Sequence, residues 1–114
     1  MKEVIAIIRS GRWTVTKAKL TELGITSYTT SRVFGRGRQK GLRYLSRLGG
    51  TIGMRTVPKR LVWLWLHEEQ VPRVIEALMA VNRTGAIGDG KIFVCPAEDA
   101  IRLRTGDRGE LAVF

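Results

Sequence analysis

The sequence predicts an α+β fold in which a four-stranded antiparallel sheet carries two helices on one face. Two observations indicate this class. Segments with strand composition and segments with helical periodicity follow the order strand, helix, strand, strand, helix, strand. The chain has 114 residues, enough for one two-layer core and too few for a second domain. This order is the split βαβ, or ferredoxin-like (βαββαβ), arrangement.

The first half of the chain supplies a strand, a helix and a second strand. Residues 2–8 are apolar on both faces, which indicates a buried strand. An amphipathic helix is expected over 13–23, because apolar positions recur there at helical spacing and Gly24 follows as a C-cap. Residues 27–34 are rich in Thr, Tyr and Val, a composition typical of strands. The stripe on the helix consists of Trp13, Thr16, Leu20 and Leu23.

The second half of the chain repeats the pattern after a long loop. The loop, 35–57, contains six glycines and no clear period, so we expect it to be flexible. Residues 59–67 predict a third strand and 91–95 a fourth. Between them, a second amphipathic helix is expected to end near Asn82. Its stripe consists of Val71, Val74, Ile75 and Leu78. A short irregular element is expected at 101–104.

Two helices cover only one face of such a sheet, yet the first and third strands are apolar on both faces. Trp63 and Trp65 lie on the same side of the third strand. Large exposed apolar patches are rare on monomeric proteins. We therefore expect a closed homo-oligomer whose sheets face its centre, rather than a monomer with an exposed apolar sheet.

Basic residues dominate the charge of the chain. There are 20 Lys and Arg against 10 Asp and Glu, a formal net charge of +10. Between Glu22 and Glu68 no acidic residue occurs, whereas nine basic residues do. Such a block indicates an anionic partner, such as phosphates, nucleic acid, a dicarboxylate or an acidic protein surface. A solvated basic loop that only favours solubility remains the alternative.

A glycine-lysine turn at residues 85–91 resembles a phosphate-binding P-loop without matching it. Ile92 stands where the metal-binding Ser or Thr of a P-loop should be, and the turn follows a helix and precedes a strand, the reverse of the P-loop order. Its glycines still allow backbone amides to approach an anion, and Lys91 supplies a charge. A plain Asp-Gly turn leading into a strand is the alternative.

Other function classes have little support. The longest apolar run, 61–66, is far shorter than the roughly 20 residues of a membrane span, and the first residues do not predict a signal peptide. The single cysteine, Cys95, fits a reducing cytoplasm, where we expect the protein to act. His67 has no Cys or carboxylate cluster near it at metal-ligand spacing, and no nucleophile and base pair is apparent. The protein is therefore not expected to be an enzyme.

The amino-acid sequences of several segments resemble those of the PII signal-transduction family. Residues 84–94 (TGAIGDGKIFV) resemble its B-loop, and residues 101–109 (IRLRTGDRG) its C-loop. Residues 35–41 (GRGRQKG) and 57–59 (VPK) resemble the two ends of its T-loop. The resemblance covers the whole chain and implies a single PII-type domain, 1–114, with a flexible T-loop at about 35–57. Three segments, MKEVIAIIR, GRGRQKGLRYLSR and VNRTGAIGDGKIFVCP, are most similar to the branch encoded beside nitrogenase genes.

The resemblance also implies ligands and the residues that bind them. PII proteins are ferredoxin-like homotrimers that bind ATP or ADP between subunits, and many bind 2-oxoglutarate with Mg²⁺ and ATP. By this resemblance, Gln39 would coordinate the metal and Lys59 would hold a 2-oxoglutarate carboxylate. Gly37 and Thr29 would lie near the nucleoside. The phosphates would be bound by Gly88, Gly90, Lys91 and Arg38, and by Arg102 and Arg104 of a neighbouring subunit.

Two functional hypotheses follow. In the first, the protein senses ATP, ADP and 2-oxoglutarate, and its basic loop binds and controls a target enzyme. The nitrogenase-associated branch implies nitrogenase as the target, with a PII paralogue as a possible second component. Another nitrogen-metabolism protein, such as an ammonium channel, is the alternative target. In the second, a ferredoxin-like basic module binds RNA or another nucleic acid, which would require aromatic side chains exposed on the sheet. A monomer would leave Trp63 and Trp65 available for this role, whereas a trimer would bury them.

Overall fold

The computed structural model describes residues 1–36, 43–45, 52–54 and 56–114. Gly37, Arg38 and Gln39, which the sequence assigns to the ligand site, lie outside the described residues. The elements are β1 (Lys2–Arg9), α1 (Trp13–Glu22), β2 (Thr29–Gly35), β3 (Arg43–Leu45), β4 (Ile52–Met54), β5 (Val57–Leu66), α2 (Val71–Asn82), β6 (Gly90–Pro96) and α3 (Glu110–Val113), with 3₁₀ turns at Ser10–Arg12 and Glu68–Gln70.

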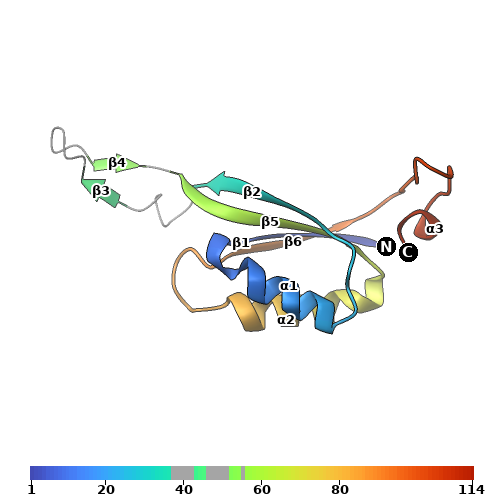
Figure 1. Cartoon of the computed structure of the whole chain (residues 1–114), viewed down its shortest axis with the longest axis horizontal. Coiled ribbons are helices and arrows are strands. Elements are labelled where there is room, and N and C mark those ends of the chain that lie inside the picture. Colours follow the sequence, from blue (N-terminus) through green and yellow to red (C-terminus); the bar gives the residue numbers. More distant parts are fainter. Residues whose placement is uncertain (37–42, 46–51, 55) are drawn as a thin grey trace.

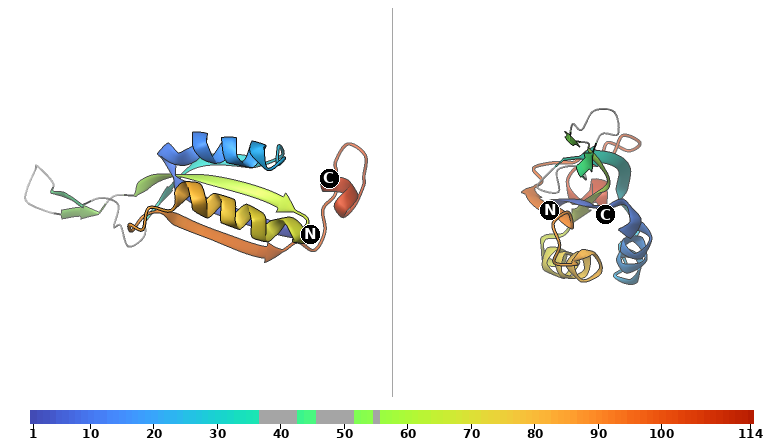
Figure 2. Two further views of the ribbon diagram at one scale, coloured as in Figure 1. Left: turned by 90° about the horizontal axis from the view of Figure 1, so that it is seen from below. Right: turned by 90° about the vertical axis from the view of Figure 1, so that its left-hand side faces the viewer.

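Four strands form one antiparallel sheet in the order β2-β5-β1-β6. Both long helices, α1 and α2, lie on the same face of this sheet, so neither of them covers the opposite face (Figures 1 and 2). The sequence prediction of a ferredoxin-like α+β fold is confirmed, and the strand and helix boundaries differ from the expected ones by no more than a few residues.

The core lies between the sheet and the two helices, because alternate strand residues point toward the helices. In β1 the residues on this face are Val4, Ala6 and Ile8, all buried. Register pairs Val4 with Leu64 and Ala6 with Val62, so the central strands present one continuous apolar layer. The helices cover it with the predicted stripes, of which Thr16, Leu20, Val71, Val74 and Leu78 are buried.

Helix α1 ends where Gly24 predicts. Gly24 has φ +79°, a conformation that glycine adopts without steric cost. The Gly24 amide donates to Thr21 O at 2.9 Å, and the Ile25 amide donates to Leu20 O at 2.9 Å. These two bonds form a Schellman motif, and Leu20 and Ile25 both join the core. The C-cap therefore directs the chain from α1 toward β2.

The opposite face of the sheet is apolar and uncovered. Register places six large apolar side chains on it, all only partly buried or exposed: Ile5, Ile7, Leu61, Trp63, Trp65 and Phe93. Trp63 is 37% exposed and Phe93 is 47% exposed. We call these six residues the open face. The sequence predicted such a face from strands that are apolar on both sides.

Two elements were not predicted. Within the expected loop 35–57, β3 and β4 pair as a small antiparallel sheet of their own, in which Arg43 faces Met54. After β6, the short helix α3 follows the tail (Figure 1). Neither segment has the apolar periodicity by which the longer elements are recognised, so pairing and local contacts, not composition, account for them.

Candidate functional site

The glycine loop, residues 84–90, joins the end of α2 to the start of β6. The order helix, loop, strand confirms the prediction from the sequence. A P-loop follows a strand and precedes a helix, so this loop is not a P-loop. Register pairs Gly90 with Ile8 and Lys91 with Ile7, which places the loop at the end of β1. Register also pairs Lys59 with Arg9, so Lys59 begins the adjacent strand at the same end of the sheet.

The carboxylate of Asp89 holds the glycine loop in shape. Its Oδ2 accepts hydrogen bonds from the Thr84 amide at 2.8 Å and the Gly85 amide at 2.9 Å. Its Oδ1 accepts a bond from the Thr84 hydroxyl and lies 3.5 Å from Arg9 Nε. The Thr84 hydroxyl in turn accepts a bond from the Ala86 amide at 3.1 Å. One side chain thus satisfies the first amides of the loop and fixes their directions.

These bonds lower the pKa of Asp89 to about 2. The hydrogen bond from the Thr84 hydroxyl contributes most, followed by the Thr84 amide, and the Gly85 amide and Arg9 add to the effect. Each donor stabilises the ionised form of the carboxylate. Asp89 is therefore a carboxylate across the physiological pH range and does not act as a proton donor.

The side chains of Arg9 in β1 and Lys59 in β5 attach the glycine loop to the sheet. Arg9 Nη2 donates to Ile87 O at 3.0 Å, and Lys59 Nζ donates to Gly88 O at 2.6 Å. Lys59 is 8% exposed. Its burial, and then the charge of Arg9, lower the pKa of Lys59, whereas Asp89 opposes the shift. Two cations are thus held close together beneath one loop, an arrangement that favours a nearby anion.

Glycine at position 90 is required by the protein itself. Gly90 has φ +114°, and a Cβ atom there would lie 1.8 Å from Ile7 O. Any side chain would separate β6 from β1 at this point. Gly88, with φ +103°, also has a backbone conformation that favours glycine. The alternative of a structural Asp-Gly turn therefore explains Gly90 fully, whether or not a phosphate binds there.

Several donors of the glycine loop remain available to an anion. Lys91 is exposed and makes no ion pair with any described residue. The amides of Ile87 and Gly88 make no hydrogen bond to another residue in the described part of the chain. Arg9 Nε is buried and, despite its 3.5 Å approach to Asp89, lacks an aligned hydrogen-bond acceptor among the described residues. The exposed Lys91 ammonium and the two free amides of the loop are donors that an anionic ligand could use.

Arg102 and Arg104 lie at the other end of the molecule. Strand β6 runs from the glycine loop to Pro96, which pairs with Lys2, and the tail follows from there (Figure 1). The tail turn, residues 101–108, closes with a bridge between Ile101 and Arg108. Arg102 Nη1 lies 3.7 Å from Asp107 Oδ2, which orients this side chain. Arg104 is exposed and makes no ion pair within the described residues.

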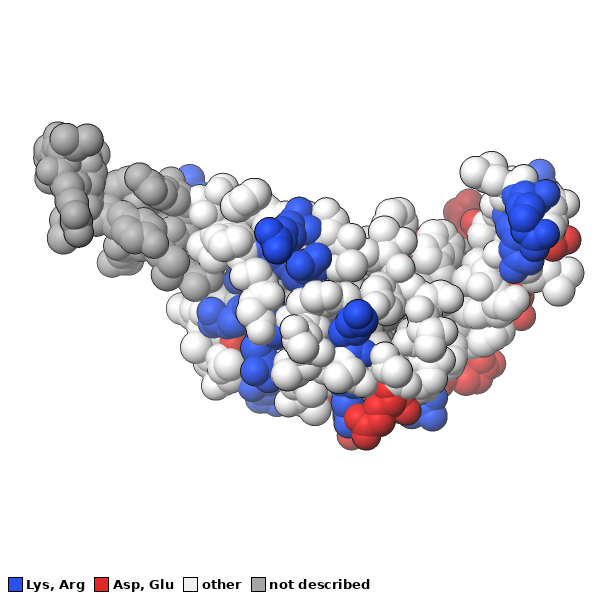
Figure 3. All heavy atoms as spheres, in the orientation of Figure 1, with Lys and Arg blue, Asp and Glu red and all other residues white. Residues whose placement is uncertain are grey.

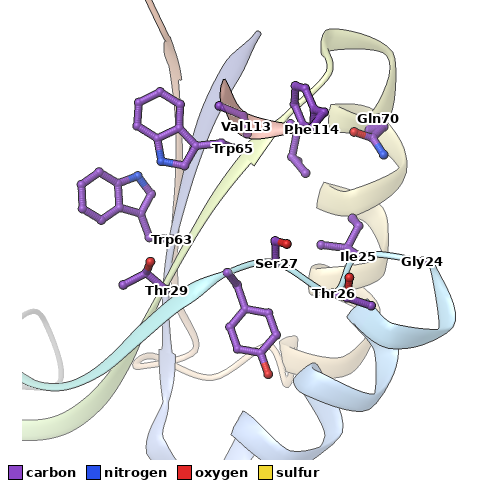
Figure 4. A pocket seen from close by; sticks show the side chains of 12 residues that line it. Gly24, Ile25, Thr26, Ser27, Thr29, Trp63, Trp65, Gln70, Val113 and Phe114 are labelled. Carbon is purple, nitrogen blue, oxygen red and sulfur yellow. The ribbon is translucent and has the colours of Figure 1, made fainter. Parts of the chain in front are cut away.

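Thr29 lines a pocket of about 410 Å³ on the open face. Figure 4 shows the two indole rings of Trp63 and Trp65 on the same side of β5, with Thr29 beside Trp63. The ring centroids of the two tryptophans are 6.2 Å apart and their planes are tilted by 30°. Val113 and Phe114, which follow the tail turn, line the same pocket. Flat apolar walls with a hydroxyl nearby suit a planar ring.

The predicted site residues therefore fall into two groups within one chain. The loop group, Lys59, Gly88, Gly90 and Lys91, meets at one end of the sheet. The tail group, Thr29, Arg102 and Arg104, belongs to the other end, so a single chain does not bring the two groups together.

Sequence reasoning gave no role to two residues that hold the glycine loop. Asp89 stands inside the motif, and its place before Gly90 is a turn signal that could have identified it. Arg9 left no local signal, because its contact with Ile87 spans 78 positions of sequence. Only the strand register brings Arg9 beneath the loop.

Comparisons with known proteins identify the family. The family model described as nitrogen regulatory protein P-II matches residues 1–107. The chain is 47% identical over its whole length to a "Nitrogen fixation nifHD region GlnB-like protein 2" of Methanobacterium ivanovii, all of which is covered. It is 46% identical over 99% of its length to the protein of that name in Methanothermobacter marburgensis, again covered completely. It is 42% identical over 99% of its length to the nitrogen regulatory protein P-II of Pasteurella multocida, also fully covered.

The fold and the glycine loop define a ferredoxin-like protein with a glycine-rich turn at one end of its sheet, and the chain belongs to the P-II family of nitrogen regulatory proteins. The relatives named for the nifHD region associate it with the nitrogen-fixation branch of this family. Members of the family are regulatory signal proteins rather than enzymes. The family match favours the regulator over the nucleic-acid hypothesis. Among the described residues, no helix is long and apolar enough to cross a bilayer.

Proposed function

We propose that this protein senses ATP or ADP together with 2-oxoglutarate, and that it controls nitrogenase through its loop at about 35–57. One observation carries the proposal. The loop group and the tail group offer complementary parts of an anion and nucleotide site, yet they lie at opposite ends of one chain. The site would become complete only where the loop end of one copy meets the tail end of the next.

This arrangement supports a closed ring of copies. Contacts between two different ends of a chain are head-to-tail, and such contacts close into a ring when the rotation permits. The family implies that the ring is a trimer. The open face would then be turned to the centre of the ring, where it would be removed from water. Leu103, which is 99% exposed at the tip of the tail turn, would gain a neighbour in the same way.

The nucleotide would be shared between the two groups. Lys91 and the amides of the glycine loop would bind the phosphates, joined by Arg38, Arg102 and Arg104. Several cations converging in a partly buried cleft bind a polyphosphate far better than one exposed lysine, because charge-assisted hydrogen bonds strengthen as water is excluded. The adenine ring and its ribose would lie near Thr29, Gly37 and the tryptophan pocket.

Lys59 is suited to the second ligand, 2-oxoglutarate. It is buried beside the glycine loop with Arg9 nearby, and a carboxylate would compensate the two cations. Among the described residues no group of three His, Cys, Asp or Glu side chains could hold a metal ion. Mg²⁺ would therefore rely on oxygen atoms of the two ligands and on Gln39.

The loop would report the state of the site. Gly37, Arg38 and Gln39 belong both to the proposed site and to the start of the loop, so ligands would favour one loop conformation over others. The names of the relatives, which refer to the nifHD region, support nitrogenase as the target. A PII paralogue would act as a second component in this control.

Two measurements test the proposal. Analytical ultracentrifugation should give three times the mass of the chain, and titration calorimetry should show 2-oxoglutarate binding that requires ATP and Mg²⁺. A monomer that binds no adenine nucleotide at millimolar concentration would contradict the proposal. A trimer that binds both ligands but leaves nitrogenase activity unchanged would contradict only the choice of target.

A further inference from the structure

We propose that the root of the loop carries a docking surface for an acidic protein segment with an aromatic or apolar side chain. The surface consists of Phe34, Pro58, Arg32 and Arg60, and we call it the root surface. The inference rests on the proposed role of the protein as a regulator that binds a target, and it adds a contact on the sheet itself.

The root surface lies where two strands extend beyond the rest of the sheet. Strand β1 ends at Arg9, which pairs with Lys59. Strands β2 and β5 continue past this point, with Phe34 facing Pro58 and Gly35 facing Val57. By register, the four residues of the root surface share the face of the sheet that carries the helices. They therefore point away from the open face and from the interface proposed between copies.

An aromatic side chain is exposed at the centre of this projection. Phe34 is 72% exposed. An exposed strand position does not require an apolar side chain, so the fold does not explain the phenyl ring. Pro58, directly opposite, is also exposed. An exposed aromatic ring flanked by Arg is the side-chain composition of an interface hot spot, because aromatic residues and Arg are enriched where binding energy concentrates.

The positions of Arg32 and Arg60 are unfavourable for the stability of the fold. Arg32 and Arg60 face each other directly across β2 and β5, and like charges at such positions are destabilising. Neither makes an ion pair with a described residue. The Arg60 guanidinium lies 5.5 Å from the centre of the Trp13 ring, and its buried Nε has no hydrogen-bond acceptor among the described residues. An incoming carboxylate would relieve the repulsion between the two arginines.

Charge complementarity favours an acidic protein segment as the occupant. Figure 3 shows that, on the face it presents, Lys and Arg predominate toward the grey loop, whereas acidic and basic side chains are mixed in the lower middle of the molecule and at the tail. An exposed phenyl ring beside two cations matches a peptide that alternates carboxylates with aromatic or apolar side chains.

A binding experiment with defined acidic polymers tests the root surface without assuming a target. The intact protein, saturated with ATP, is titrated with a labelled copolymer of glutamate and tyrosine and with polyglutamate of equal length. We expect the copolymer to bind more tightly than polyglutamate. We expect Phe34→Ala to lower the affinity for the copolymer about tenfold and the affinity for polyglutamate less than twofold. We expect Arg32→Glu to lower the affinity for both polymers about tenfold. Two exposed helix positions provide matched controls, and Met79→Ala and Lys17→Glu should change neither by more than about twofold.

The outcomes separate this inference from the proposed function. Equal copolymer binding by Phe34→Ala and the unmodified protein would overturn the root surface, whatever the protein does to nitrogenase. Loss of the trimer in Phe34→Ala would also overturn it, because the surface would then join copies of the chain. Tighter binding of a single-stranded RNA than of the copolymer, lost in Phe34→Ala, would assign the surface to nucleic acid instead. Unchanged ATP affinity in Phe34→Ala confirms that the variant is folded, and weaker nitrogenase inhibition by it would extend the inference to the target.

Discussion

The two ends of the sheet hold their functional groups in different ways. At the loop end, the glycine loop is attached to distant parts of the chain, since Arg9 and Lys59 donate to its carbonyls from β1 and β5. At the tail end, every hydrogen bond and ion pair that holds the described turn 101–108 joins residues between 99 and 109. The glycine loop is therefore part of the folded sheet, whereas the tail turn is a local structure.

This difference indicates how a shared site could work. Groups that are fixed before binding lose little freedom when the ligand arrives, whereas groups on a local turn adapt to it. The glycine loop would provide the preformed half of the proposed site. The tail turn would provide the adjustable half, and its position would depend on the neighbouring copy.

The largest effect is expected from a methyl group at the loop end. Gly90→Ala places Cβ 1.8 Å from Ile7 O at φ +114°, so the loop must leave β1. We expect the free energy of unfolding to fall by about 3 kcal/mol. Gly106→Ala is the matched control at the tail end, because Gly106 has φ +76° with no atom near its Cβ position. It should cost about 1 kcal/mol. Urea denaturation measures both, and equal losses would contradict the difference between the two ends.

The next effect concerns ATP. Lys91→Ala and Arg104→Ala should each make the free energy of ATP binding less favourable by about 1 to 3 kcal/mol, because each removes a charged hydrogen-bond partner of the phosphates. Titration calorimetry measures both variants alone and after they are unfolded and refolded together. In a mixed ring, about a quarter of the interfaces would carry both native residues and regain tight binding. If the mixture bound ATP no better than either variant, the two residues would not act across an interface.

A smaller effect is expected for 2-oxoglutarate. Lys59→Met keeps most of the buried side-chain volume and removes the charge beneath Gly88. We expect 2-oxoglutarate to bind about tenfold more weakly, or about 1.4 kcal/mol, while ATP changes less. Calorimetry with each ligand alone and with both together distinguishes the two effects. A loss of ATP affinity as large as that of 2-oxoglutarate would mean that Lys59 acts by supporting the glycine loop.

The smallest effect is a dependence on acid pH. The pKa of Asp89 is lowered from 3.8 to about 2. Its contribution to loop stability is therefore complete above pH 3.8 and is lost as the pH falls through about 2. Hydrogen exchange measured by NMR should show the Thr84 and Gly85 amides losing protection in this window, beyond the intrinsic effect of pH. The amides of the tail turn should not share this change, and Asp89→Asn should abolish it.

Part of the site could be predicted from the sequence because its residues lie close together within short segments of the chain. The glycines, Lys91 and the order of helix, loop and strand are local features. The Asp-Gly pair was recognised as a turn, but its carboxylate was given no role, because its partners depend on how the loop folds back on Thr84. Arg9 and Lys59 could not be linked by inspection, because they are 50 positions apart and meet only through register.

The sequence by itself determined the α+β fold, the strand and helix order, and an apolar face that two helices cannot cover, because these depend on side-chain periodicity along continuous segments. It also determined that Gly24 would end α1. Only the tertiary structure decided that Lys59 lies beneath the glycine loop, that Arg102 and Arg104 lie at the far end, and that Phe34 is exposed beside paired arginines. These are consequences of strand register and chain direction, which arise from contacts between segments that are distant in sequence.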